Sequence, residues 1–292
     1  MDVPRTAAGA PFVAHPRLQQ SLLRCLYVWA MRHPASGYVQ GINDLATPFL
    51  AVFLEEKLRE NAAAGSPAAA AAVEKGRRAF FFGRASDSEG CADGGGSSAG
   101  GGAQGEQEGQ SAAGGREGES DIAAAVSSLP EALLLAAEAD VYWCLCEMLD
   151  RIHDHYTFAQ PGIQVKCDSL TNLIERLDPA VARNLEEQGV QVLQFAFRWF
   201  NCLLVREVPF ACTPRLWDVY LSEGDDFPDF LIYVAASLLL TYRGQVASME
   251  FQDLVMFLQA LPTSDWGTAD LDLVLSRAFM WRAKARLPKK GE

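Results

Sequence analysis

The stretch VQVLQFAFRWFNCLLVR, residues 190–206, decides the fold class of this chain. Its apolar side chains recur every three or four residues, which is the spacing of one face of an α-helix. They are Val192, Phe195, Ala196, Trp199, Cys202 and Leu203. Phe197, Phe200 and Leu204 add apolar groups to the remaining faces. The pattern therefore predicts a helix at the centre of a hydrophobic core.

The same period recurs along most of the chain. Leu18, Leu22, Leu26 and Trp29 share one helical face, and Pro16 suits the first turn of that helix. Further helices are predicted over 130–152, 162–177, 180–188, 228–242, a segment after Ser248, and about 268–285. No segment alternates apolar and polar residues with a period of two. The predicted fold class is all-α and multi-helical.

Composition narrows the function classes. The chain has 292 residues, 49% of them apolar, and a net charge of −12. That charge disfavours nucleic acid as the main partner, because phosphate binding needs clustered Lys and Arg. The longest apolar run, Phe230–Leu240, is shorter than the roughly 20 residues of a membrane span, so direct membrane insertion is not expected. Seven Cys at irregular spacings suggest reduced thiols and a cytoplasmic protein.

A Gly-rich acidic segment interrupts the helical pattern. Residues 86–120 hold twelve Gly, seven acids and one base, with no aromatic residue, Val, Ile or Leu. Such a segment buries too little apolar surface to offset its ordering entropy, which predicts disorder. We therefore divide the chain into an N-terminal segment, 1–59, a low-complexity and largely disordered insertion, 60–128, and a C-terminal helical part, 129–287.

Four possible metal ligands lie close together in the sequence, namely Cys144, Cys146, His153 and His155. Residues two apart on a helix do not share a face, so the two thiols diverge. We interpret them as two core-side thiols followed by two solvated imidazoles, and no metal is expected.

The stretch HPASGYVQGINDL, residues 33–45, breaks the helical pattern with Pro, Ser and Gly. Gln40 lies beside Gly41, which leaves its backbone unobstructed, and a neutral amide offers both donors and an acceptor. It can hold a water molecule and contact an anionic oxygen together. A helix start explains the same residues without any site, since Asn43 and Asp44 suit the first-turn amides. The pattern of residues 33–45 alone favours this second interpretation. DVPRT, residues 2–6, taken alone resembles an ordinary polar N-terminal tail.

Taken together, these segments resemble the TBC domain of Rab GTPase-activating proteins. DVPRT is similar to the family's I-x-x-D-x-x-R motif from Asp2 to Arg5, and Tyr38–Asn43 is similar to Y-x-Q-G-x-N. Later stretches resemble the family in the same order. They are YTFAQPGIQ (156–164), LQFAFRWF (193–200), REVPF (206–210) and RLWDVYLSEG (215–224). The residues of these stretches are most similar to those of a Golgi-associated TBC subgroup.

The resemblance implies catalytic help from outside a GTPase. Arg5 would enter the site of a GTP-bound Rab as an arginine finger, and Gln40 would orient the attacking water as a glutamine finger. Asp2 and Thr6 would support the Arg5 loop, and Tyr38, Gly41 and Asn43 would shape the Gln40 turn. GTP and Mg²⁺ would be bound by the partner, so no cofactor is expected in this chain.

Other matched residues receive structural roles. Arg198, Arg206, Arg215 and Asp218 lie in apolar helical segments, so we expect them in buried ion pairs. Trp199 and Trp217 are expected in the core. The family has further helices before the arginine-finger loop, so the resemblance implies that the N-terminal part of the domain is missing here.

Two function classes follow. The first is a GTPase-activating protein for a Rab-type small GTPase, without hydrolase activity of its own. The second is a non-catalytic TBC-fold interaction module that binds a Rab or an adaptor. In either case an adaptor would recruit the chain peripherally to the Golgi or other endomembranes.

Overall fold

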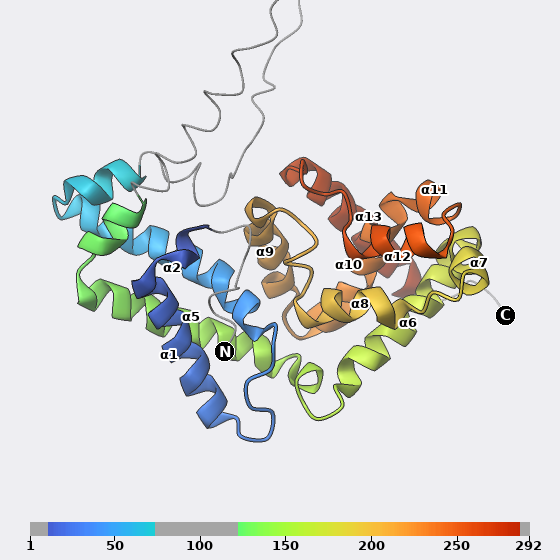
Figure 1. Ribbon diagram of the computed structural model, residues 1–292, viewed down its shortest axis with the longest axis horizontal. Coiled ribbons are helices and arrows are strands. Elements are labelled where there is room, and N and C mark those ends of the chain that lie inside the picture. Colours follow the sequence, from blue (N-terminus) through green and yellow to red (C-terminus); the bar gives the residue numbers. More distant parts are fainter. Residues whose placement is uncertain (1–10, 74–121, 287–292) are drawn as a thin grey trace, which may run out of the picture.

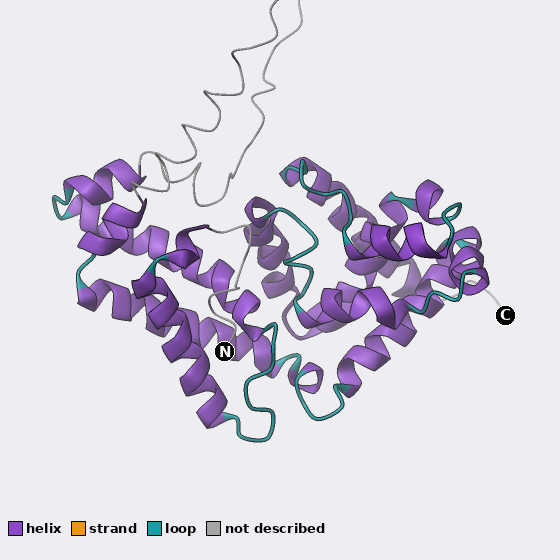
Figure 2. Ribbon diagram, in the orientation of Figure 1, coloured by secondary structure: helices purple, strands orange, loops and turns teal. Residues whose placement is uncertain are grey.

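The computed structural model describes residues 11–73 and 122–286, which fold into helices joined by short loops (Figure 2). No strand occurs among these residues, and the predicted all-α fold class is confirmed. The longer helices are α1 (Pro16–Arg32), α2 (Ile42–Ala63), α5 (Glu131–Asp150), α6 (Pro161–Leu177), α7 (Pro179–Glu187), α8 (Val192–Asn201), α9 (Thr213–Glu223), α10 (Phe227–Thr241), α12 (Phe251–Gln259) and α13 (Thr268–Arg286). The short ones are η2 (Pro11–Ala14), η3 (His153–His155), η4 (Phe210–Cys212), η5 (Gly224–Asp226) and α11 (Arg243–Val246).

The helices form two groups that α5 and α6 connect through η3 (Figure 1). In the first group α1, α2 and α5 pack against one another. In the second group α10 packs against α6, α9 and α13, and α8 packs against α6. This arrangement places the loop before α2 and the loop before α6 on the same edge of the molecule (Figure 1).

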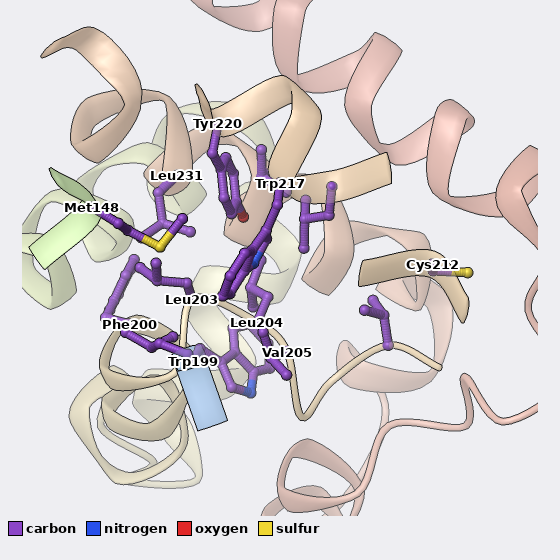
Figure 3. Close-up of a cluster of buried hydrophobic side chains, with 14 of the residues drawn as sticks. Met148, Trp199, Phe200, Leu203, Leu204, Val205, Cys212, Trp217, Tyr220 and Leu231 are labelled. Atoms are coloured by element: carbon purple, nitrogen blue, oxygen red, sulfur yellow. The ribbon is translucent and has the colours of Figure 1, made fainter. Parts of the chain in front are cut away.

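The core around α8 and α9 is largely aromatic. Trp199, Phe200 and Tyr220 are fully buried, and Trp217 is nearly so. Met148 of α5 reaches the same cluster from the other helical group (Figure 3). The core positions predicted for Trp199 and Trp217 are confirmed.

The helix predicted over 190–206 ends earlier, at Asn201. Leu203 and Leu204 adopt left-handed backbone angles, with φ of 50° and 63°. The Leu204 N–H bonds the Trp199 carbonyl at 2.9 Å, which is the closing bond of a Schellman helix end. Leucine is unfavourable in this conformation, but the reversal buries both leucine side chains almost completely. The spacing of apolar residues does not indicate this helix end, because apolar residues continue beyond it.

Helical residues also lie inside both ends of the predicted insertion, 60–128. The helix α2 extends to Ala63, and residues 67–73 and 122–128 are helical. Ala69, Ala72 and Ile122 are buried in the main core. Small Ala side chains pack closely between helices, so the Ala-rich flanks belong to the packed structure. The predicted disorder of 86–120 falls outside the described residues.

Among the described helices, none is by itself long and apolar enough to span a membrane. The segment Ile122–Ser128 and α5 meet that test of length and composition only when taken together, and they are bent by 106°.

Candidate functional site

The candidate site is built around Gln40, in the loop of residues 33–41 between α1 and α2. The Gln40 side chain is exposed, whereas every residue from Gly41 to Leu50 is buried. The polar amide therefore lies where the chain turns from solvent into the core.

Asn43 closes the turn that carries Gln40. Its Oδ1 accepts hydrogen bonds from the Tyr38 hydroxyl at 3.1 Å and from the Gly41 N–H at 3.0 Å. Gly41 has a φ of 111°, in the region that L side chains rarely adopt. Tyr38, Gly41 and Asn43 are thus joined in one turn, and the roles that the resemblance implies for them stay predictions. The helix α2 begins directly after the turn, at Ile42, without a side-chain cap hydrogen bond.

Asn201, the last residue of α8, holds the same turn from the opposite side. Its Nδ2 donates a hydrogen bond of 2.8 Å to the Gln40 carbonyl oxygen. A Cβ added to Gly41 would lie only 2.2 Å from that Nδ2, so the close approach requires glycine. The Tyr156 hydroxyl in turn donates to the Asn201 carbonyl at 2.7 Å. Three segments distant in the sequence are therefore joined through Asn201.

An ion pair between a buried carboxylate and a partly exposed guanidinium lies directly behind the turn. Arg206 approaches the Asp44 carboxylate at 2.8 Å, and only 1% of the Asp44 side chain is exposed. The Cys202 thiol contacts the same carboxylate oxygen at 3.8 Å. Burial raises the pKa of Cys202 to about 12, so the thiol stays protonated and unreactive at neutral pH.

The predicted ion pairs divide into two kinds. Arg198 pairs with Glu207 at 2.7 Å, and Glu207 is buried like Asp44. Burial raises the pKa of Glu207, and the hydrogen bond from Arg198 opposes that shift. For Arg215 and Asp218, the prediction of a buried ion pair is wrong. Arg215 meets Asp272 with both side chains about half exposed, and Asp218 is exposed, because these positions lie on the outer face of α9.

One of the four possible metal ligands also differs from the prediction made from the sequence. His155 is completely buried rather than solvated, while His153 is exposed. The chain enters η3 at this point and turns one imidazole inward, which a sequence pattern does not indicate. Within residues 11–73 and 122–286, no group of three or more His, Cys, Asp or Glu side chains could hold a metal ion.

Asp2, Arg5 and Thr6 lie outside the described residues. Their proposed roles at the arginine-finger loop therefore stay predictions, as does the catalytic role of Gln40.

Sequence reasoning missed two residues of this site, Asn201 and Tyr156. Both lie in or next to stretches that carry the family resemblance, 193–200 and 156–164. The sequence signal for Asn201 is its position directly after a run of aromatic residues. A buried amide side chain there must find hydrogen-bond partners.

A model of the Rab-GTPase-TBC domain matches residues 1–65 and 117–246, and the gap between them falls inside the predicted insertion. GTPase-activating protein gyp1 of Schizosaccharomyces pombe is 37% identical over 97% of this chain. TBC1 domain family member 22A of Homo sapiens is 39% identical over 96% of it. The chain spans 44% and 43% of the lengths of these two relatives.

The crystal structure of the Ypt/Rab-GAP domain of Gyp1p superposes with a TM-score of 0.72 and 33% identity, covering 98% of this chain and 72% of that one. The matches run through the segments that carry the Gln40 turn and its supports. Since the domain model matches more than half of the residues, the chain belongs to the Rab-GTPase-TBC domain family.

Proposed function

We propose that this chain activates GTP hydrolysis by a Rab-type small GTPase, with Gln40 and Arg5 as the groups it contributes. The observation that carries the proposal is the Gln40 turn, in which an exposed amide stands on a backbone held by Asn43 and Asn201. A group that must act on a second protein needs this combination of an accessible side chain and a fixed backbone. Family membership and the names of the two relatives, a GTPase-activating protein and a TBC1 domain protein, support it further.

The two side chains suit the chemistry. An amide can accept a hydrogen bond from the attacking water and donate one to a phosphate oxygen. A guanidinium is always charged and presents a planar fork that fits the phosphate oxygens, where charge develops during phosphoryl transfer. In this proposal the GTPase binds GTP and Mg²⁺, and this chain supplies no cofactor. Its partner is the GTP-bound form, and an adaptor brings the chain peripherally to the Golgi or another endomembrane.

The direct test is phosphate release from a panel of GTP-loaded Rab proteins under single-turnover conditions. Arginine fingers accelerate hydrolysis by roughly 10³ to 10⁵, so we expect Arg5→Ala to remove most of the stimulation. Gln40→Ala should do the same, because the water loses its orienting amide. Gln20→Ala is the matched control, since Gln20 is an exposed glutamine on α1.

Stimulation that survives both Arg5→Ala and Gln40→Ala contradicts these assignments. Binding of a Rab without stimulation, unaffected by nucleotide state and by both substitutions, identifies the chain instead as a TBC-fold interaction module.

A further inference from the structure

The loop between η3 and α6 presents one aromatic side chain entirely to solvent. Phe158 is 96% exposed, whereas the next most exposed large apolar side chains among the described residues, Met31 and Leu273, are 65% exposed. Exposing a phenyl ring forfeits the free energy that its burial would contribute. This position therefore stands out from the scattered apolar residues that any protein surface carries.

The backbone of this loop is strained in a way that fixes the ring at its tip. The Gln160 N–H bonds the Thr157 carbonyl at 2.9 Å, so residues 157–160 form a four-residue turn with Phe158 at its second position. Ala159 and Gln160 have φ of 65° and 46°, conformations that favour glycine or asparagine. Such strain persists only where the surrounding structure enforces it, and it is concentrated at functional sites.

Three contacts enforce the turn. The Gln160 side chain donates to the His155 carbonyl, and the Gln164 side chain donates to the Ala159 carbonyl, both at 2.9 Å. The Asp154 carboxylate packs so closely on Gly162 that a Cβ there would lie 2.3 Å from it. The loop is thus closed at both ends, and the backbone that carries Phe158 is held in place before any partner arrives.

The loop shares its anchor with the Gln40 turn. Tyr156, two residues before Phe158, is buried and donates its hydroxyl hydrogen bond to Asn201, which also holds the Gln40 carbonyl. Two residues of chain span about 7 Å at most. A standard protein interface covers about 800 Å² on each partner, a patch roughly 30 Å wide. Both loops lie on the same edge of the molecule (Figure 1), so one bound protein can cover both.

We infer that Phe158 is a docking residue, and that its ring enters an apolar depression on the GTPase whose nucleotide Gln40 reaches. The inference rests on the proposed function and adds the residue that supplies affinity. An exposed aromatic on a fixed backbone suits that role, because its burial contributes apolar area and a phenyl side chain has only two rotatable bonds to order on binding.

The test compares Phe158→Ala with the unsubstituted chain. Single-turnover GTP hydrolysis is measured at increasing concentrations of the chain, with a Rab that the unsubstituted chain activates. We expect the half-saturating concentration to rise at least tenfold while the maximal rate stays unchanged, since Phe158 binds and does not touch the reacting atoms. Phe158→Leu should restore part of the affinity, and thermal unfolding should be unchanged by either substitution.

Phe251→Ala is the control, because Phe251 is an aromatic residue at the start of α12 that is 51% exposed. An unchanged half-saturating concentration for Phe158→Ala overturns the inference while activation stands. A shift in oligomeric state with unchanged activation overturns it too and assigns Phe158 to contact between copies of the chain.

The proposed function and this inference can fail separately. If the unsubstituted chain binds a GTP-loaded Rab without accelerating hydrolysis, activation fails, and a tenfold weaker equilibrium binding of Phe158→Ala still supports the docking role. If no Rab of the panel binds in either nucleotide state, the docking role is overturned as well.

Discussion

At the scale of single residues, the site depends on one hydrogen bond between distant parts of the chain. The Asn201 side chain holds the Gln40 carbonyl at 2.8 Å, 161 positions away in the sequence. The bond reaches the backbone rather than the amide of Gln40. It fixes where the side chain starts and leaves the amide exposed to a partner.

If the chain activates a GTPase through Gln40 as proposed, Asn201→Ala should lower that activation without preventing folding. A lost neutral hydrogen bond costs about 1 kcal/mol of stability, whereas a misplaced catalytic group can cost tenfold or more in rate. We expect at least a tenfold fall in catalytic efficiency. In a Gln40→Ala background the same substitution should have no further effect, because no amide remains to be positioned. The measurement is a double-mutant cycle on single-turnover rates.

The matched control is Asn184→Ala. Asn184 donates to the carbonyls of Val246 and Met249 at 2.7 and 3.0 Å, far along the chain from the Gln40 turn. Its loss should reduce stability to a similar degree and leave activation intact. If Asn201→Ala is equally harmful with and without Gln40, its role is structural only.

At the scale of elements, α8 and the reversal that follows it organise the site. Leu203 and Leu204 turn the chain back sharply, so Asn201, Cys202 and Arg206 all lie close to the start of α2. A helix continuing to residue 206 would carry Arg206 about 7.5 Å beyond Asn201 along the helix axis. The helix end therefore brings the Asp44–Arg206 pair and the Asn201 hydrogen bond together.

Arg206→Ala should destabilise the domain. It removes the cation that pairs with the buried Asp44 carboxylate, and because the Arg206 side chain is itself 41% exposed, we expect a loss of about 1–3 kcal/mol. Arg215→Ala is the control, because Arg215 and Asp272 form a half-exposed surface pair worth about 0–1 kcal/mol. Denaturant unfolding measures both values, and equal losses for the two variants would contradict this account.

At the scale of the whole molecule, a buried histidine lies between the two groups of helices. His155 is in η3, the connection from α5 to α6, and burial lowers its pKa to about 4. The nearby Asp154 opposes this shift and Lys166 adds to it. In the unfolded chain the pKa is about 6.5, so the imidazole there becomes charged at a higher pH than it does in the folded protein.

Folding stability should consequently fall as the pH drops from about 6.5 towards 4. In that range the unfolded chain binds more protons than the folded one, so acid favours unfolding. Between pH 7 and pH 4.5 His155 alone should account for about 2 to 3 kcal/mol. His155→Gln removes the titrating group, and the pH dependence of its free energy of unfolding should be flatter by that amount.

His153→Gln provides the comparison, because His153 lies in the same short helix but is exposed. Its stability profile should follow that of the unsubstituted chain. Parallel profiles for His155→Gln and the unsubstituted chain would mean that another group carries the acid sensitivity.

The helical architecture followed from the spacing of apolar residues along the chain, and the break before α2 followed from Pro34 and the glycines around Gln40. Apolar residues at helical spacing must be buried on one face, so α1, α6 and α10 could be placed to within a residue or two. The first half of α2 could not be bounded from the sequence, because it is buried on every side, including its polar residues Asn43, Asp44 and Thr47. Gly41 and Asn43 came from the family resemblance, and the hydrogen bond between them joins residues only two positions apart.

The contacts that hold Gln40 in place could not be predicted without the packed structure. Asn201, Tyr156 and the Asp44–Arg206 pair act between residues tens to more than a hundred positions apart. Their partners depend on how the helices pack, and a local pattern carries no information about that. The helix end after Asn201 and the inward turn of His155 are of the same kind, since burial of distant side chains there outweighs local preference.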